Sequence, residues 1–258
     1  MKHALSLIVM IGTMAAALSA WADARHFTYS YEADSVLPKG KWEFEQWLTL
    51  RTVKNTQNFY RFDFREEIET GLTDRLTTAL YLNFRDVHDD GADAFEFKGV
   101  SSEWKYMVLS PHTKWLGLLL YGEAKYEGEE VEWEEKIILE HIFGEKWILA
   151  MNLIAEHVWE FEDDEVLTEL ELEQTLGLAY KLSPHWSLGL EARVHSEWAH
   201  YNEYEHSVLF VGPNIHYEGT KAWVTFTLLP QILDLKNGGR NLDEHEAIEA
   251  RVIAGVLF

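Results

Sequence analysis

The chain ends with the stretch Arg251-Val252-Ile253-Ala254-Gly255-Val256-Leu257-Phe258. Every second residue from Val252 to Phe258 is apolar or small, and a period of two is the pattern of a β-strand with one apolar face. The same alternation occurs far upstream. In residues 59–70, aromatic and aliphatic side chains occupy one face, while arginines and acidic residues occupy the other. Runs of this length predict a sheet whose two faces meet very different surroundings.

Reading the whole chain for this period predicts twelve strands. Most are long enough for a tilted membrane strand, which needs about 9–11 residues. Tight turns rich in Gly, Pro and Asp alternate with longer, more polar connections such as 86–94, 199–204 and 232–244. We therefore predict an all-β fold, a twelve-stranded antiparallel up-and-down transmembrane β-barrel with short periplasmic turns and longer external loops. The strands are expected at 41–53, 58–70, 75–85, 95–109, 115–126, 131–143, 147–161, 166–181, 186–198, 205–217, 222–231 and 245–258.

The tryptophans are grouped near the expected strand ends, which suggests two aromatic girdles at the membrane interfaces. The periplasmic group is Trp42, Trp115, Trp147, Trp186 and Trp223, and the opposite group is Trp133, Trp159 and Trp198.

Some positions fit the alternation badly. Glu66 and Glu135 fall on the row assigned to lipid, so we expect either a β-bulge that shifts the local register or a place near the headgroups. Strands 95–109 and 205–217 have ambiguous parity, since Phe210 and Val211 suit either face.

The other end of the chain has the features of a secretory leader. Residues 4–20 are almost wholly apolar or small, and Ala22-Asp23-Ala24 fits a small-x-small cleavage pattern, with Ala20-Trp21-Ala22 as a second candidate. We predict a cleaved signal peptide at residues 1–24 and a single outer-membrane β-barrel domain at 25–258, with a retained anchor as the alternative. Beyond the leader, no run of 18 apolar residues predicts a membrane helix.

Composition narrows the chemistry. The chain has no cysteine, so disulfides and thiolate chemistry are excluded. Its formal charge of −22 argues against a nucleic-acid partner, whose binding surface is basic. We see no nucleotide motif and no cofactor box, so we predict a passive protein without a cofactor. The stretch 25–40 is too short for an energised plug and is expected at the periplasmic mouth.

An exported chain that ends on an amphipathic strand with Phe258 resembles the Gram-negative outer-membrane β-barrels. The resemblance implies a location in the cell outer membrane, contact with its lipids and lipopolysaccharide, and recognition of Phe258 as an assembly signal by the barrel-assembly machinery. The opening Leu37-Pro38-Lys39-Gly40-Lys41-Trp42-Glu43-Phe44-Glu45 is similar to that of outer-membrane transporters grouped with phenol-degradation-pathway channels, and of barrel families of unknown role. It covers about ten residues and implies no substrate.

The charged rows are expected to face the lumen, where ions need water or partners. We predict an outer-membrane channel for passive diffusion of small polar solutes, which prefers cations because wall carboxylates select them by their field. Glu169, Glu171 and Glu173 are the candidate acidic wall, and Arg61, Arg65, Arg193 and Arg251 are candidates for a facing constriction. A closed barrel with an ion-paired core is the alternative. The predicted pore-lining residues are Arg61, Asp63, Arg65, Glu67, Glu69, Glu132, Glu134, Lys136, Glu156, Glu169, Glu171, Glu173, Glu191, Arg193, His195, Glu249 and Arg251.

Two further functions are open to the sequence. The outer-membrane phospholipase also uses twelve strands, with a Ser–His pair on its lipid-facing wall. Here Ser196 and His206 or Ser207 lie near the outer rim, but no acid or amide orients the base, so we predict no enzyme. Imidazoles and carboxylates on the external loops suit zinc or copper, but their spacing matches no ligand set, so we predict a solvated surface and no metal site. These loop residues are His88, His200, His206, His245, Asp89, Asp90, Asp93 and Asp243.

Overall fold

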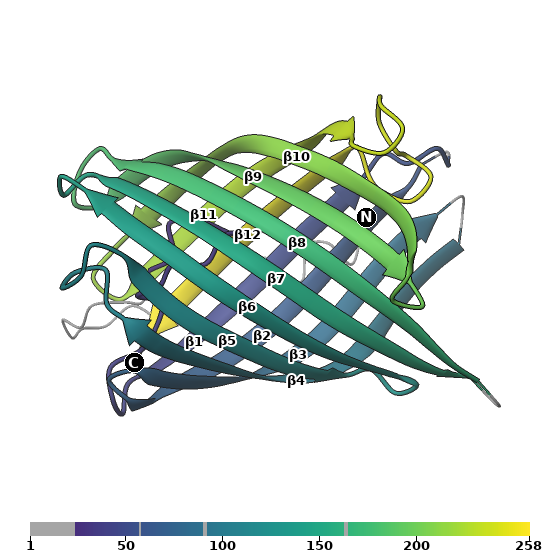
Figure 1. Ribbon diagram of the computed structural model, residues 1–258. Helices are drawn as coiled ribbons and strands as arrows, with labels where there is room; N and C mark the ends of the chain where they lie inside the picture. The colour runs from purple at the N-terminus through teal and green to yellow at the C-terminus, as the bar shows by residue number, and fades with distance from the viewer. Residues whose placement is uncertain (1–23, 57, 90–91, 163–164) are drawn as a thin grey trace.

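The structure is a computed structural model that describes residues 24–56, 58–89, 92–162 and 165–258. These residues form a closed barrel in which each strand pairs with its neighbours in the chain and β1 pairs with β12 (Figure 1). The predicted fold class is therefore confirmed. The strands are β1 Trp42–Thr52, β2 Tyr60–Thr73, β3 Leu76–Asp89, β4 Ala92–Leu109, β5 Gly117–Tyr126, β6 Glu130–Phe143, β7 Trp147–Glu162, β8 Glu165–Lys181, β9 Trp186–Ala199, β10 Glu203–Glu218, β11 Ala222–Asp234 and β12 Ile248–Leu257.

Among the described residues, no helix combines the length and the apolar character needed to cross a bilayer. The predicted signal peptide falls on residues 1–23, which lie outside the described part, and on Ala24.

The end of the barrel at which β1 begins and β12 ends is called the periplasmic end, and the opposite end is called the outer end. The predicted external loop 86–94 is wrong, because β3 and β4 pair out to Asp89 and Ala92. The predicted loop 199–204 is present but shorter, because β9 and β10 pair out to Ala199 and Glu203. Backbone hydrogen bonds do not depend on apolar side chains, so the ladder continues beyond the apolar band. The long outer connections are 53–59 and 235–247.

The exterior of the barrel carries the aliphatic row and the interior carries the charges. On β9, Leu190 is 56% exposed, whereas the next residue, Glu191, is 1% exposed. Leu80 on β3 is 62% exposed on the same outer surface. Such a large apolar surface is rare on soluble monomers and requires hydrocarbon around it.

One predicted girdle residue is wrong. Trp42, Trp115, Trp147 and Trp186 are exposed at the periplasmic end, but Trp223 is buried inside the barrel, where its indole N–H donates to Glu43. The parity of β11 turns it inward, because Ala222 and Val224 are the residues on the lipid side.

Glu66 and Glu135 remain on the outer row, and the bulges offered as one explanation are absent. The register of β2 and of β6 runs unbroken past both residues. Instead each carboxylate has a polar neighbour. Gln46 donates to Glu66 over 2.8 Å, and the indole of Trp133 donates to Glu135 over 2.5 Å. Hydrogen bonds to these carboxylates lower the cost of placing them at the surface of the barrel.

β-Bulges decide the two strands whose parity was ambiguous. In β4 the register with β3 shifts at Lys98, which places Phe95 and Phe97 outside and Lys98 inside. In β10 the register with β9 shifts at Glu205, and Phe210 is fully buried inside. An extra residue in one strand re-aims the side chains that follow it.

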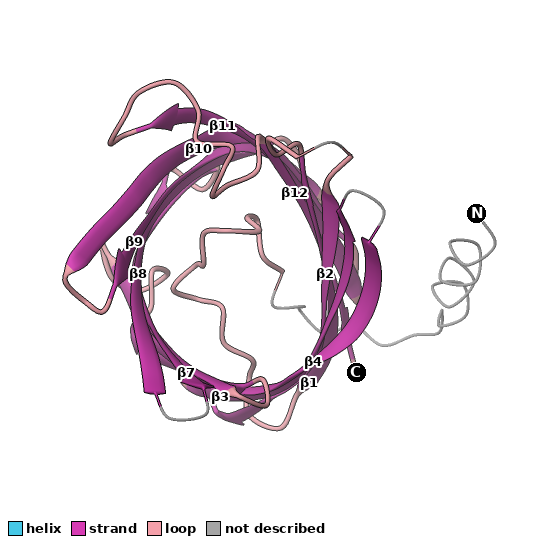
Figure 2. Cartoon of the chain, turned by 90° about the vertical axis from the view of Figure 1, so that its right-hand side faces the viewer, coloured by secondary structure: helices cyan, strands magenta, loops and turns pink. Residues whose placement is uncertain are grey.

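The N-terminal segment, defined here as residues 25–37, lies inside the barrel and not at its mouth as predicted. Figure 2 shows it crossing the interior as an irregular loop. Phe27, Tyr29 and Tyr31 are each 5% exposed or less. Phe27 packs on Ile148, Ala150 and Ala179, and Tyr29 packs on Val208, Phe210 and Leu229. A Cβ at Gly177 would lie only 2.7 Å from Phe27, so glycine provides the room for this ring.

Candidate functional site

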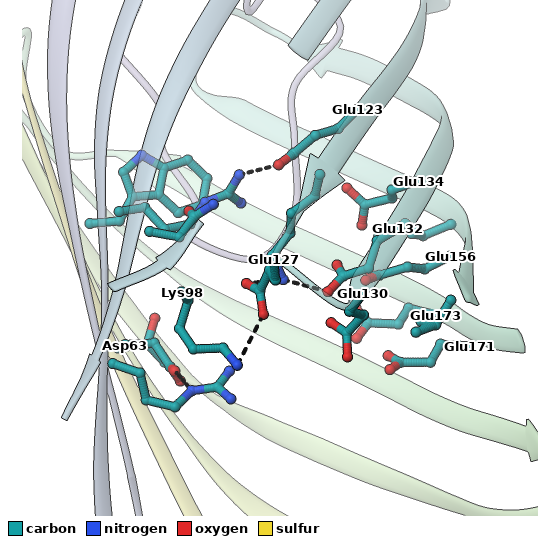
Figure 3. A pocket seen from close by; sticks show the side chains of 18 of the residues that line it. Asp63, Lys98, Glu123, Glu127, Glu130, Glu132, Glu134, Glu156, Glu171 and Glu173 are labelled. Atoms are coloured by element: carbon teal, nitrogen blue, oxygen red, sulfur yellow. Dashed lines mark hydrogen bonds and ion pairs between the residues drawn. The ribbon is translucent and has the colours of Figure 1, made fainter. Parts of the chain in front are cut away.

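A charged cavity of about 510 Å³ lies inside the barrel, bordered by Tyr29 and Tyr31 of the N-terminal segment (Figure 3). Eleven acidic and nine basic side chains line it. The basic side chains come mainly from β1–β4 and the acidic ones mainly from β5–β8, so the two kinds of charge stand on different walls. Low-dielectric walls of opposite charge focus a field across a lumen.

The basic wall is organised around one carboxylate. Asp63 accepts from Arg61 over 3.0 Å and from Arg85 over 2.7 Å, and it also contacts Arg51. Asp63 thus contacts three guanidinium groups, of which Arg51 also lies 3.6 Å from Glu249. The bases outnumber the acids in this part of the wall. Figure 3 shows Asp63 on the side of the cavity opposite Glu156 and Glu171, whereas Lys98 lies between, 3.2 Å from Glu127.

The acidic wall contains a row of glutamates that meet across five adjacent strands. In the register of the sheet, Glu123 is opposite Glu134, Glu134 is opposite Glu156, Glu156 is opposite Glu171, and Glu171 is opposite Glu197. We call these five residues the carboxylate row. Like charges directly opposite one another destabilise a sheet, so the row needs nearby positive charge.

Fixed bases compensate only part of the carboxylate row. Arg65 pairs with Glu123, and Lys136 lies 2.9 Å from Glu134. Among the described residues, no Lys or Arg lies within 4.0 Å of the Glu156 carboxylate, and the only basic group that close to Glu171 is His195 at 3.6 Å. The centre of the row is therefore the place where a mobile cation would be stabilised most by uncompensated negative charge.

Twelve of the predicted pore-lining residues border the cavity, namely Arg61, Asp63, Arg65, Glu132, Glu134, Lys136, Glu156, Glu169, Glu171, Glu173, Arg193 and Arg251. Glu67, Glu69, Glu191, His195 and Glu249 are buried away from it. Glu173 is bound by Arg193 and His195, so its charge is matched locally. The three glutamates of the predicted acidic wall, Glu169, Glu171 and Glu173, thus all line the cavity, but the charge of Glu173 is compensated by neighbouring bases.

The four arginines predicted to form a constriction all border the cavity, but their partners differ. Arg193 donates to both carboxylate oxygens of Glu249, over 2.9 and 3.0 Å. Arg251 donates to the hydroxyl of Thr49 and to the carbonyl of Thr28. Sequence reasoning missed Lys98, Glu123, Glu127, Glu130 and Glu160, which also line the cavity. Glu123 shares the inward row of Lys125 and was within reach of the pattern. Lys98 depends on the bulge.

Side chains of the wall hold the N-terminal segment in place. The carboxylate of Glu191 accepts from three consecutive backbone amides, those of Thr28, Tyr29 and Ser30, over 2.8–3.0 Å. Asn152 binds both the N–H and the carbonyl of Tyr31, over 2.6 and 2.9 Å. Consecutive N–H groups make an anion-binding concavity, which here receives a charge from the barrel itself. The segment is therefore anchored to the barrel wall where Tyr29 and Tyr31 border the cavity.

Asp34 and His112 form an ion pair at the periplasmic end, with 2.8 Å between Oδ2 and Nε2. The hydrogen bond that His112 donates to Asp34 raises the pKa of His112, and burial partly opposes this effect. Burial acts to raise the pKa of Asp34, but the hydrogen bond and charge of His112 lower it overall. The raised His112 pKa means that the folded state holds this proton more tightly than the unfolded chain does.

We expect replacement of His112 by glutamine to destabilise the barrel in a pH-dependent way. The contribution of His112 is fully present below pH 6.5, the ordinary pKa of histidine, and is lost as the pH rises through the raised pKa. Thermal unfolding of the unaltered protein and of the His112→Gln variant, measured from below pH 6.5 upward, gives the difference in stability at each pH. A gap that widens with rising pH contradicts the assignment.

The Ser–His pair of the hydrolase alternative does not form. Ser196 and Ser207 are opposite each other and hydrogen-bond over 2.7 Å, whereas His206 is opposite Glu197 on the inward row. The two serines and the histidine thus lie on different faces of the wall. His206 and His245 are also not on a solvated loop surface, because they are only 3% and 9% exposed.

The closed barrel, its apolar exterior and its charged interior define an outer-membrane β-barrel protein. The chain belongs to the family of unknown function DUF6662, whose family model matches residues 19–258. A search of curated proteins gave no match.

Solved structures show the same fold at low sequence identity. The COG4313 outer membrane channel from Pseudomonas putida F1 is 14% identical, with a TM-score of 0.64 over 86% of this chain and 97% of that one. The NanC porin is 8% identical, with a TM-score of 0.54 over 83% and 98% of the two chains. The KdgM porin, solved with disordered oligogalacturonate, is 7% identical, with a TM-score of 0.53 over 84% and 99%.

Proposed function

We propose that this chain is an outer-membrane channel for the passive diffusion of small polar solutes, that it prefers cations, and that the N-terminal segment limits its conductance. The observation that carries the proposal is the carboxylate row, of which Glu123, Glu134, Glu156 and Glu171 line the cavity. Wall carboxylates select cations through their field and need no fixed ligand geometry. The similar solved structures named above include an outer-membrane channel and porins, which supports transport as the class of function.

The opposed walls favour solutes that carry charge. A solute crossing the cavity passes between the arginines around Asp63 and the glutamates of β6–β8. A transverse field orients a dipolar solute and excludes an apolar one, which has no partner for the wall charges. The expected solutes are therefore small inorganic cations and small organic molecules with a positive group.

A closed barrel with an ion-paired core is the second candidate. It is favoured by the N-terminal segment, whose buried residues fill the periplasmic half of the interior. In that case the network of Arg51, Arg193 and Glu249 would serve stability alone.

Recording from purified protein in planar bilayers under a salt gradient separates the two candidates. We expect a small, steady conductance with a reversal potential of the sign that cations set. A reversal potential set by anions contradicts the cation preference. Lack of conductance both in the unaltered protein and in a variant with a released N-terminal segment contradicts the channel and supports the closed barrel.

A further inference from the structure

Three histidines from separate parts of the chain meet at the outer end of the barrel. His195 lies on β9, His206 on β10, and His245 on the connection 235–247. One ligand atom from each lies within 4.8 Å of the others. The ring centroids of His206 and His245 are 4.4 Å apart, and those of His195 and His245 are 4.9 Å apart. We call these residues the histidine triad.

The histidine triad contains buried nitrogens without hydrogen-bond partners. His206 is 3% exposed, and neither of its ring nitrogens has a hydrogen-bond partner, although Nε2 lies 3.3 Å from the Glu197 carboxylate. Nε2 of His245 is also buried without a hydrogen bond. A buried polar atom without a partner costs about 1–3 kcal/mol. An ion bound between the rings would remove this cost.

The surroundings have the features of a metal site. Nδ1 of His195 lies 2.9 Å from the carboxylate of Glu173, the arrangement that fixes the ring of a metal-binding histidine and leaves its other nitrogen for the ion. The ring nitrogens of His206 and Nε2 of His245, which have no hydrogen-bond partner, remain available to bind an ion.

A β-bulge and several backbone hydrogen bonds place His206 and His245 in the triad. The bulge at Glu205 sets the parity that turns His206 inward. Hydrogen bonds attach the connection 235–247 to the barrel wall. The side chain of Gln231 accepts from the N–H of Asn241 over 2.6 Å and donates to its carbonyl over 2.9 Å. The N–H of Ala247 donates to the carbonyl of Val53 over 2.8 Å. These bonds hold His245 over the other two rings.

An acidic cavity adjoins the triad at the outer end. A second cavity, of about 570 Å³, borders His206 at the outer end, and its acidic lining includes Glu205, Asp234, Asp243 and Glu244. On the inner side, Glu173 joins His195 to the charged cavity. The triad thus stands between an acidic outer cavity and the lumen.

We propose that His195, His206 and His245 bind one first-row transition-metal ion, such as Zn²⁺, at the outer end of the barrel. Three imidazoles with nearby carboxylates suit Zn²⁺, Ni²⁺ and Cu²⁺ and do not suit Mg²⁺ or Ca²⁺, which take oxygen ligands. The rings close slightly on binding, since zinc–nitrogen bonds are about 2.0–2.1 Å long. The site does not require that the barrel conducts.

Titration calorimetry with Zn²⁺ on the full chain, prepared without a polyhistidine tag and stripped of metal, tests the proposal. We expect one ion per chain with an affinity of about 1 μM or tighter. Replacing His245 with glutamine weakens binding by about 10–100-fold or more, and His206→Gln does the same. His245 lies outside the strands, so this variant tests the site even if His206→Gln fails to fold.

The matched control is His88→Gln, which removes another histidine from the outer end and leaves the triad intact. It should bind like the unaltered protein, with Mg²⁺ giving no heat in any of them. Co²⁺ gives an independent readout, because its visible spectrum reports nitrogen ligands. Absence of saturable Zn²⁺ binding, or equal binding by His245→Gln and the unaltered protein, overturns the proposal.

Discussion

Replacing Glu191 with alanine raises the conductance of the barrel severalfold. The carboxylate of Glu191 is 1% exposed and accepts from the backbone N–H groups of Thr28, Tyr29 and Ser30. Hydrogen bonds to a charged group contribute about 1.5–3 kcal/mol each, and their loss leaves three buried N–H groups without partners. The N-terminal segment then leaves its place for a larger share of the time, and the periplasmic side of the cavity opens.

Thiol labelling measures the same release independently of conductance. The chain has no cysteine, so a single Ser30→Cys provides the only thiol. Ser30 is fully buried. We expect slow labelling by a polar maleimide in the otherwise unaltered chain, and labelling faster by about tenfold or more when Glu191→Ala is added, because the segment opens locally while the strands stay paired.

The matched control is Glu203→Ala on the neighbouring strand β10, where the glutamate is exposed at the outer end. It should change neither conductance nor labelling. Circular dichroism verifies that each variant keeps its strands. Faster labelling without any rise in conductance would show that the segment moves but does not limit the pore, and unchanged labelling would remove Glu191 from its anchoring role.

Neutralising the centre of the carboxylate row removes most of the cation preference. The variant carries Glu134→Gln, Glu156→Gln and Glu171→Gln, which keep the size of the side chains on β6, β7 and β8. A unit charge about 4 Å from an ion contributes about 1 kcal/mol in water, which is a factor of about five in local ion concentration. We therefore expect the cation-to-anion permeability ratio to fall by about fivefold or more, measured as a shift in reversal potential.

The control has the same number of substitutions and the same change in net charge. Glu162→Gln, Glu165→Gln and Glu203→Gln replace exposed glutamates that do not line the cavity. A nearly unchanged ratio is expected there. If both triple variants shift the ratio equally, overall charge and not the row sets the preference. If neither does, the carboxylate row has no part in selection.

The positions of the strands could be predicted from the sequence because alternation with a period of two is a local property of each strand. Charged and apolar residues alternate along most of β2, β8 and β9, with Glu66 as an exception, and most predicted strand ends lie within a few residues of those observed. The exceptions have local physical causes. The bulge at Lys98 adds a residue that inverts the parity of part of β4, and the polar ends of β3 and β9 pair beyond the apolar band.

The N-terminal segment was misplaced for a different reason. Its aromatic residues, Phe27, Tyr29 and Tyr31, alternate like those of a strand but are followed by Pro38 and Gly40. A usable signal lay elsewhere, in inward positions that are apolar or small, such as Ala150 and Leu229. Apolar residues on a charged lumen wall need an apolar partner to shield them from water, and the N-terminal segment provides it through Phe27 and Tyr29.

The sequence by itself determined that this protein is a twelve-stranded barrel with hydrocarbon outside and charge inside, because the period of two is a property of neighbouring residues. The tertiary structure alone decided which charges meet. The carboxylate row joins Glu123 on β5 to Glu197 on β9 through strand register, and the histidine triad depends on a bulge and on a connection folded over the outer end. Register depends on the turns, bulges and pairing between neighbouring strands, and closure depends on the pairing of β1 with β12. The period of two along one strand records none of these.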